Sequence, residues 1–154
     1  MTEIVILLEQ NGAGQRLIDA ALERQANGAC DFTLLMPLAP VRMNTRQGTV
    51  IMSVGVPRSS DEVTDYARAA RRLDDAIEAF RVYGVQTCGE IGDPRPMRAI
   101  ETYLKNHEPD EIIVPVVDHP VARLLHQDLP TRLQRRFHIP VTKIPAQPTR
   151  RPAP

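Results

Sequence analysis

Residues 4–25, IVILLEQNGAGQRLIDAALERQ, contain a strand, a glycine turn and a helix in succession, and they decide the fold class. The stretch opens with a continuous apolar run, which is typical of a strand buried on both faces of a sheet. From residue 15 to 26, apolar side chains recur every three or four positions, which predicts an amphipathic helix. Asn27 and Gly28 then supply a helix-stop signal. The stretch therefore predicts the first half of a β-α-β unit.

The alternation of strand and helix continues along the chain. An irregular segment, 38–58, interrupts it with one possible short strand (TVIMSV), and this segment is either a surface excursion or a flap over a site. Pro115 lies inside the fourth predicted strand, so we expect regular pairing to fail near the end of that strand. The other strands are predicted at 31–36, 85–91, 111–117 and 139–144, and the other helices at 59–83, 94–107 and, in two short pieces, within 118–137.

Two of the later helices have recognisable start signals. Residues 59–62, SSDE, match a capping box. Asp93 is expected to cap the following helix, with Pro94 at its first position, where the missing N–H costs nothing. Spacings of three or four residues predict the apolar stripe of the first of these helices, which contains Val63, Tyr66, Ala67, Ala70, Leu73, Ile77 and Phe80.

The order of elements, β-α-β-loop-α-β-α-β-α-β, predicts an α/β fold. In such a fold a five-stranded, parallel, doubly wound sheet lies between two layers of helices. We expect one domain over 1–145 and a Pro-rich, extended and flexible tail over 146–154. Ligands of these sheets bind at the carboxyl ends of the strands where the winding direction reverses. The loops after the first and fourth strands are therefore the predicted site.

The composition argues against several classes of function. Lysine plus arginine equals aspartate plus glutamate at 19 each, so no global field attracts nucleic acid or an anionic membrane. No run approaches the roughly 20 apolar residues of a membrane span, and the N-terminus lacks the pattern of a signal peptide. Cys30 and Cys88 are expected to be reduced thiols that pack near the starts of strands. We therefore expect a cytoplasmic protein with no nucleic-acid role and no membrane insertion.

Four stretches of the sequence resemble the universal stress protein family of the adenine-nucleotide alpha hydrolase-like superfamily. They are IVILLEQ (4–10), GDPRPMRAIE (92–101), DEIIVPVV (110–117) and LPTRLQRRFHIPVTKI (129–144). The resemblance spans nearly the whole chain outside 38–58 and is more specific in the second half. The stretch from residue 128 to 136 is also similar to short actinobacterial proteins related to that family. The resemblance implies a Rossmann-like three-layer sandwich with strand order 3-2-1-4-5.

The sequence departs from the family where members bind ATP. Those members carry an aspartate after the first strand and a G-x-x-G motif, followed by G-[ST], after the fourth. Here the first strand is followed by Glu9-Gln10-Asn11, and no glycine follows Gly92. Glycines allow backbone N–H groups to approach phosphates closely, which a Cβ atom would obstruct. We therefore expect no cofactor, and ATP in the usual pose of the family is disfavoured.

The glycine turn QNGAGQ (10–15) is not a dinucleotide-binding loop. The third glycine of that fingerprint would fall at Leu17, and no acidic residue ends the second predicted strand. The turn either only connects strand and helix or contacts a smaller ligand at the helix N-terminus. For that second reading the candidate contacts, on the two predicted loops, are Asn11, Gly12, Gly14, Asp118, His119 and Arg123.

No motif in the sequence indicates catalysis or a metal site. His119 and His126 are seven residues apart, but no cysteine and no H-E-x-x-H spacing accompanies them. No G-x-S-x-G motif is present. The C-terminal quarter is basic because of Arg132, Arg135, Arg136, Lys143, Arg150 and Arg151. That quarter is either a solvated helix face or a surface for an acidic partner or anion.

The resemblance implies a non-enzymatic protein that acts in stress response or regulation through protein contacts. Family members commonly pair through their last strand, so a homodimer is expected through Ile139, Val141 and Lys143. One alternative is a module that binds a nucleotide or a small anion on the two predicted loops. A second alternative is an enzyme of the alpha-hydrolase superfamily, although the sequence has neither the S-G-G-x-D-S nor the H-x-G-H signature.

Overall fold

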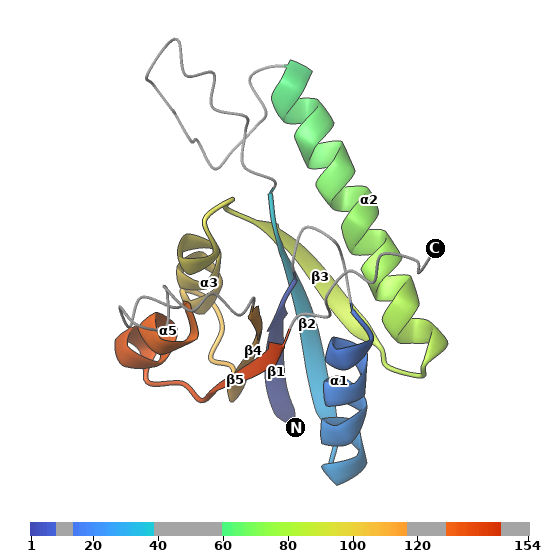
Figure 1. Ribbon diagram of the computed structural model, residues 1–154, viewed down its shortest axis with the longest axis vertical. Coiled ribbons are helices and arrows are strands. Elements are labelled where there is room, and N and C mark those ends of the chain that lie inside the picture. The colour runs from blue at the N-terminus through green and yellow to red at the C-terminus, as the bar shows by residue number, and fades with distance from the viewer. Residues whose placement is uncertain (9–13, 39–59, 117–128, 146–154) are drawn as a thin grey trace, which may run out of the picture.

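The computed structural model describes residues 1–8, 14–38, 60–116 and 129–145, and within 60–63 it describes the backbone alone. Strands and helices alternate along these residues (Figure 1). The bounds are β1 Thr2–Leu7, α1 Gln15–Asn27, β2 Cys30–Pro37, α2 Ser60–Val82, β3 Thr87–Gly92, α3 Pro96–Leu104, β4 Glu111–Val116, α5 Leu129–Phe137 and β5 Val141–Pro145.

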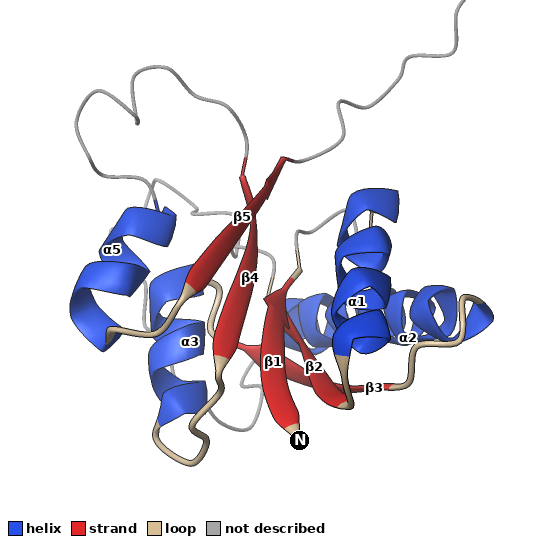
Figure 2. Ribbon diagram, turned by 90° about the horizontal axis from the view of Figure 1, so that it is seen from below, coloured by secondary structure: helices blue, strands red, loops and turns tan. Residues whose placement is uncertain are grey.

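The five strands form one parallel sheet in the order β3-β2-β1-β4-β5. The chain first winds from β1 towards β3 through α1 and α2, and then from β4 towards β5 through α5. Right-handed crossovers in opposite directions place their helices on opposite faces of the sheet. Figure 2 shows the result, with α1 and α2 on one face and α3 and α5 on the other. The predicted fold class and strand order are therefore confirmed.

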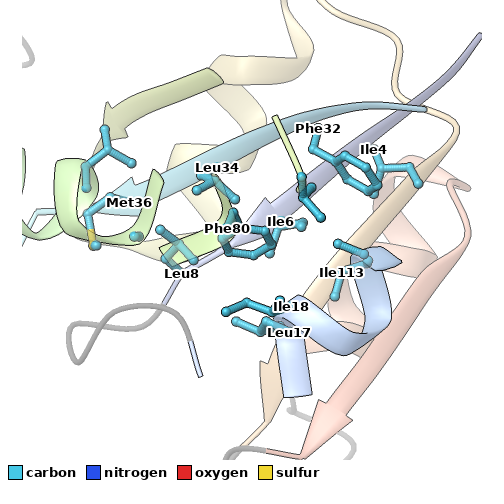
Figure 3. Close-up of a cluster of buried hydrophobic side chains, with 14 of the residues drawn as sticks. Ile4, Ile6, Leu8, Leu17, Ile18, Phe32, Leu34, Met36, Phe80 and Ile113 are labelled. Carbon is cyan, nitrogen blue, oxygen red and sulfur yellow. The ribbon is translucent and has the colours of Figure 1, made fainter. Parts of the chain in front are cut away.

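A cluster of buried apolar side chains forms the core between the sheet and helices α1 and α2. Ile4, Ile6 and Leu8 alternate along the first strand and its end, and Phe80 of α2 packs among them with its side chain fully buried (Figure 3). Leu17 and Ile18 of α1 close the other side of this cluster. Every second side chain of a strand lies on the same face of the sheet. The even-numbered positions of β1 therefore face helices α1 and α2.

The second core lies between the sheet and helices α3 and α5. Val5 and Leu7, the odd-numbered positions of β1, pack there against Ile100 of α3 and Leu133 of α5. Both helical side chains are fully buried. Because β1 is buried on both faces, its continuous apolar run in the sequence is explained.

Pairing at the end of β4 differs between its two neighbours. On the side of β1 the register stops at Ile113, before Pro115. On the side of β5 it continues through Pro115 and Val116. The expected failure of pairing is confirmed on the side of β1, where proline has no N–H to donate. The expectation is wrong on the side of β5.

The apolar stripe of α2 is shifted from the predicted one. Tyr66 has 49% of its surface exposed, and Ala67 is exposed as well. The side chains that are buried against the sheet are Ala69, Leu73, Ala76 and Phe80. A run rich in alanine allows two overlapping stripes at helical spacing, and the large residues at 73 and 80 decide which of them faces the core.

The start of α3 and one cysteine also differ from the sequence-based expectation. The helix begins at Pro96 after Arg95, so Pro96 and not Pro94 occupies the first turn. Asp93 instead accepts a hydrogen bond from the backbone N–H of Arg95 at 2.8 Å. Cys30 is half-buried, as a packing role requires, whereas Cys88 is exposed on β3. The packing role expected for Cys88 is therefore wrong.

Some expectations concern residues outside those that the structure describes. The possible strand 49–54 lies within the undescribed segment 39–59. The expected tail coincides with the undescribed residues 146–154.

A close approach between β3 and α3 gives a test of this packing. A Cβ atom on Gly92 would lie 2.8 Å from the Cβ of Ala99 and 3.3 Å from Cδ1 of Leu35. We expect Gly92→Ala to lower the free energy of unfolding by about 1–3 kcal/mol, because the helix must move off the strand. Urea unfolding measures the change. Gly14→Ala is the control, since a Cβ there has no atom of the described residues within 4 Å. An equal loss of stability in both variants would contradict this account of the packing.

Candidate functional site

The winding direction of the sheet reverses between β1 and β4. These adjacent parallel strands pair from Ile4 with Glu111 to Ile6 with Ile113. After β1 the chain proceeds to α1 on one face, and after β4 it proceeds to α5 on the other (Figure 2). The carboxyl ends of β1 and β4 therefore lie at a point where the winding direction reverses, and doubly wound sheets bind ligands at such points.

Most of the candidate contacts lie outside the described residues. The undescribed segment after β1 covers 9–13, and the one after β4 covers 117–128. The structure describes Gly14 alone of the candidates; those outside its residues are Asn11, Gly12, Asp118, His119 and Arg123. Whether the five join Gly14 in one site stays a prediction.

Gly14 forms the N-terminal cap position of α1. Its backbone is extended (φ −76°, ψ 157°), and its carbonyl accepts the N–H of Leu17 at 3.1 Å. A Cβ atom at this position would have no atom of the described residues within 4 Å. Neither backbone conformation nor packing therefore requires glycine here. The absence of a side chain leaves space beside the start of the helix.

The N-terminus of α1 carries positive electrostatic character. Its first turn holds no acidic residue, and its cap residue, Gly14, has no side chain that could accept hydrogen bonds from the free N–H groups. Free N–H groups and the helix dipole favour an anion at such an end. Arg16, in this first turn, reaches the carbonyl oxygen of Pro145 at 3.5 Å, at the end of β5. The carboxyl end of the sheet thus has a cation on the side of α1.

The strongest polar coupling in the described residues lies at the opposite end of the sheet. Arg24 of α1 binds Glu111, the first residue of β4, through two contacts of 2.7 and 2.8 Å. Thr142 of β5 donates its hydroxyl to the same carboxylate. Burial pushes the pKa of Glu111 up, but the bonds from Arg24 and Thr142 outweigh burial and hold this pKa below its usual value. These contacts tie three elements together.

A second polar cluster, also near the amino ends of the strands, centres on Tyr103 of α3. Its hydroxyl lies 3.0 Å from a carboxylate oxygen of Glu3 and 3.4 Å from the hydroxyl of Thr33. Burial, together with the bond to Glu3, raises the pKa of Tyr103 to about 12. The ring of His107 stacks on that of Tyr103 with centroids 4.1 Å apart. Tyr103 therefore stays protonated and serves as a hydrogen-bond donor that fixes α3 on the sheet.

The described residues hold no catalytic constellation. Shifted pKa values often mark functional sites, but here the ion pair of Glu111 and the burial of Tyr103 explain them at the end away from the switch point. Nowhere in the described ranges do three His, Cys, Asp or Glu side chains gather as a metal site would require. None of the described helices is long and apolar enough to span a bilayer.

Sequence reasoning did not identify these polar clusters. Arg24 and Glu111 are 87 positions apart, and Tyr103 and Glu3 are 100 apart. No local spacing signals such pairs. Only the register of β1 with β4, and the face on which α1 and α3 lie, bring them together.

Comparison of the sequence with known protein families finds no match, and neither does a search of curated proteins. Solved structures do match in fold. A universal stress protein family member from Burkholderia pseudomallei superposes with a TM-score of 0.60 at 21% identity, covering 94% of this chain and 96% of that one. This chain has the universal stress protein fold.

Two further structures with this fold were solved with nucleotides. A universal stress protein in complex with cAMP has a TM-score of 0.60 and 14% identity, over 93% of this chain and 96% of that one. An Arabidopsis thaliana universal stress protein family protein with AMP bound has a TM-score of 0.59 and 15% identity, over 96% of this chain and 93% of that one. At these identities the likeness shows the fold alone.

The Arg24–Glu111–Thr142 cluster predicts a specific dependence of stability on pH. Glu111→Gln should lower the free energy of unfolding at pH 7 by about 1–3 kcal/mol, because a partly buried arginine loses its charged partner. Since the folded-state pKa of Glu111 is depressed, its contribution is present above about pH 4.3 and is lost as the pH falls through the folded pKa.

Chemical unfolding between neutral and acid pH checks this dependence. The gap between wild type and Glu111→Gln should narrow as the pH falls. Glu78→Gln is the matched control, since the pair of Glu78 with Arg81 is exposed and should add little. A gap that stays constant down to acid pH would show that the charge of Glu111 does not stabilise the fold.

Proposed function

We propose that this protein is a non-enzymatic, short and divergent universal stress protein that works as a homodimer in stress response or regulation through protein contacts. The observation that carries the proposal is the position of β5, which is the last strand of the sheet and pairs with β4 on one side. Edge strands present backbone groups to which another chain can add. A twofold axis beside β5 would pair it with its own copy.

The hydrogen-bond pattern shows which groups of β5 face outward. Ile112 of β4 donates to the carbonyl of Pro140 at 2.9 Å. In a parallel ladder alternate residues then face β4, so the N–H and C=O of Val141 point away from it. The side chain of Val141 packs into the core of α3 and α5, while Thr142 is anchored on Glu111. The edge is therefore held in place before any partner binds.

A proline at position 141 tests the dimer. Val141→Pro removes an outward N–H without removing a bond to β4, so we expect the mass in solution to fall from about twice the chain mass of 17.2 kDa to the chain mass itself. Multi-angle light scattering gives the mass. Val141→Ala is the matched control, because it loses side-chain packing but keeps the N–H and should remain a dimer. A monomeric wild-type protein would refute the homodimer.

A second candidate function is binding of a nucleotide with a single phosphate at the carboxyl ends of β1 and β4. It is supported by the nucleotides in two structures of the same fold and by the positive N-terminus of α1. A triphosphate is disfavoured, because no glycine follows Gly92 to let backbone N–H groups reach it. The proposed contacts are Asn11, Gly12, Gly14, Asp118, His119 and Arg123.

Gly14 offers a clean test of this second function. Thermal unfolding with AMP, cyclic AMP and ATP should show stabilisation by the monophosphates, about 2.7 kcal/mol at 100 times the Kd. Gly14→Val fills the open space beside the helix with a side chain that an extended backbone accepts. We expect its ligand-free stability to stay close to wild type and its response to nucleotide to disappear. A protein that responds to none of the three nucleotides would end this hypothesis.

We place this role in the cytoplasm. Both Cys30 and Cys88 are free thiols, which suits a reducing compartment. An enzyme of the alpha-hydrolase superfamily remains the least supported of the three functions, since the sequence carries neither of the two signatures that such enzymes use.

A further inference from the structure

We propose that the outer surface of α3 and α5 binds a carboxylate-rich segment of a partner protein. The proposal rests on the proposed action through protein contacts and names the surface and the chemistry of the partner. Figures 1 and 2 show α3 and α5 side by side on one face of the sheet, away from α1 and α2.

Charge is divided between the two faces of a protein that is neutral overall. Helices α3 and α5 together carry four arginines and one carboxylate, a net charge of +3. Over their described side chains, helices α1 and α2 together carry six arginines and six carboxylates, a net charge of zero. The whole chain is neutral, but the fold therefore places an excess of positive charge on the layer formed by α3 and α5. One helical layer presents a positive field to a partner.

The cations gather around a single carboxylate. Arg136 of α5 bridges to Glu101 of α3 at 2.8 Å. Arg98 precedes Glu101 by three positions, so both lie on the same side of α3. Arg132 precedes Arg136 by four and lies beside it on α5. Lys105, which caps α3, follows Glu101 by four. These sides of α3 and α5 therefore carry more positive charge than Glu101 can neutralise.

Most of this charge is exposed and uncompensated. Arg98, Lys105, Arg132 and Arg135 are all exposed, and none of the four makes an ion pair with another described residue. Among the arginines of the two helices, Arg136 is the one that Glu101 neutralises. Carboxylates of a partner would supply the missing counter-charges, and guanidinium groups bind them with two parallel hydrogen bonds.

The cations are mounted on a rigid base. Leu133 of α5 and Ile100 of α3 are fully buried in the same core. The guanidinium of Arg136 also lies over the ring of Phe137, 5.5 Å from its centroid. A partner would not have to order the helices that carry the charges, which reduces the entropic cost of binding.

An acidic polypeptide fits this surface better than a nucleic acid does. The large exposed hydrophobic residues of the described chain are Met1, Tyr66, Val82 and Tyr83, and none lies on α3 or α5. The aromatic residues of these two helices, Tyr103 and Phe137, are buried and half-buried, so neither is an open platform on which bases could stack. Glu101 would also repel a continuous phosphate backbone, whereas a flexible peptide can place a hydrogen-bond donor beside it.

Fluorescence anisotropy with a fluorescein-labelled, glutamate-rich peptide tests the proposal on the full chain. Arg98→Glu/Arg132→Glu should weaken binding about tenfold or more. The matched control, Arg71→Glu/Arg72→Glu, makes the same charge change at exposed positions of α2 and should alter affinity by less than about twofold. Glu101→Gln should tighten binding, because it removes the central negative charge. Raising the salt from about 50 to about 200 mM should weaken binding by wild type.

Three results would overturn the proposal. They are no binding of the peptide at low salt, equal loss in the α2 control, and tighter binding of a single-stranded DNA of the same charge. Light scattering on the same samples separates this proposal from the homodimer. If the protein is a dimer that does not bind the peptide, only the proposed basic binding surface is refuted. If it is a monomer that binds the peptide, only the proposed homodimer is refuted.

Discussion

The short parallel pairing of β1 with β4 is the contact on which the rest of the molecule depends. Three residue pairs, from Ile4 with Glu111 to Ile6 with Ile113, join the half of the sheet that winds one way to the half that winds the other. This junction sends α1 and α2 to one face and α3 and α5 to the opposite face. It also brings the carboxyl ends of β1 and β4 side by side. The arrangement of the helical layers and of the charges on them follows from this junction.

The fold was predictable because its signals are local. The apolar run of β1 and the helical spacing of α1 each predict one element, and strict alternation of elements then fixes the architecture. The predictions were wrong where the local sequence was compatible with two structures. In α2, Tyr66 and Ala69 belong to overlapping stripes, and only packing against β2 and β3 selects the second. At α3, either Pro94 or Pro96 could begin a helix.

The site was less predictable than the fold, because its parts come from distant positions. Gly14 could be named from its turn in the sequence. The space beside it depends on how the rest of the chain packs around the start of α1. The Arg24–Glu111 pair leaves no trace in any short window of sequence. Likewise, Arg98 of α3 and Arg132 of α5 become one surface only once both helices cover the same face. The topology of the fold brings these distant residues together, and no short sequence motif encodes their contacts.

The polar groups at the amino ends of the strands differ in role from those at the carboxyl ends. At the amino ends, Arg24, Glu111 and Thr142 use charge and hydrogen bonds to hold the edge strand β5 against β4. At the carboxyl ends, the first turn of α1 keeps an unneutralised dipole and Arg16. Polar groups that are fully satisfied with each other have little left to offer a ligand. Within the described part of the chain, the ties of this kind that involve Arg24, Glu111, Thr142 and Tyr103 gather at the amino ends of the strands, so they leave the outer faces of the helices free of them.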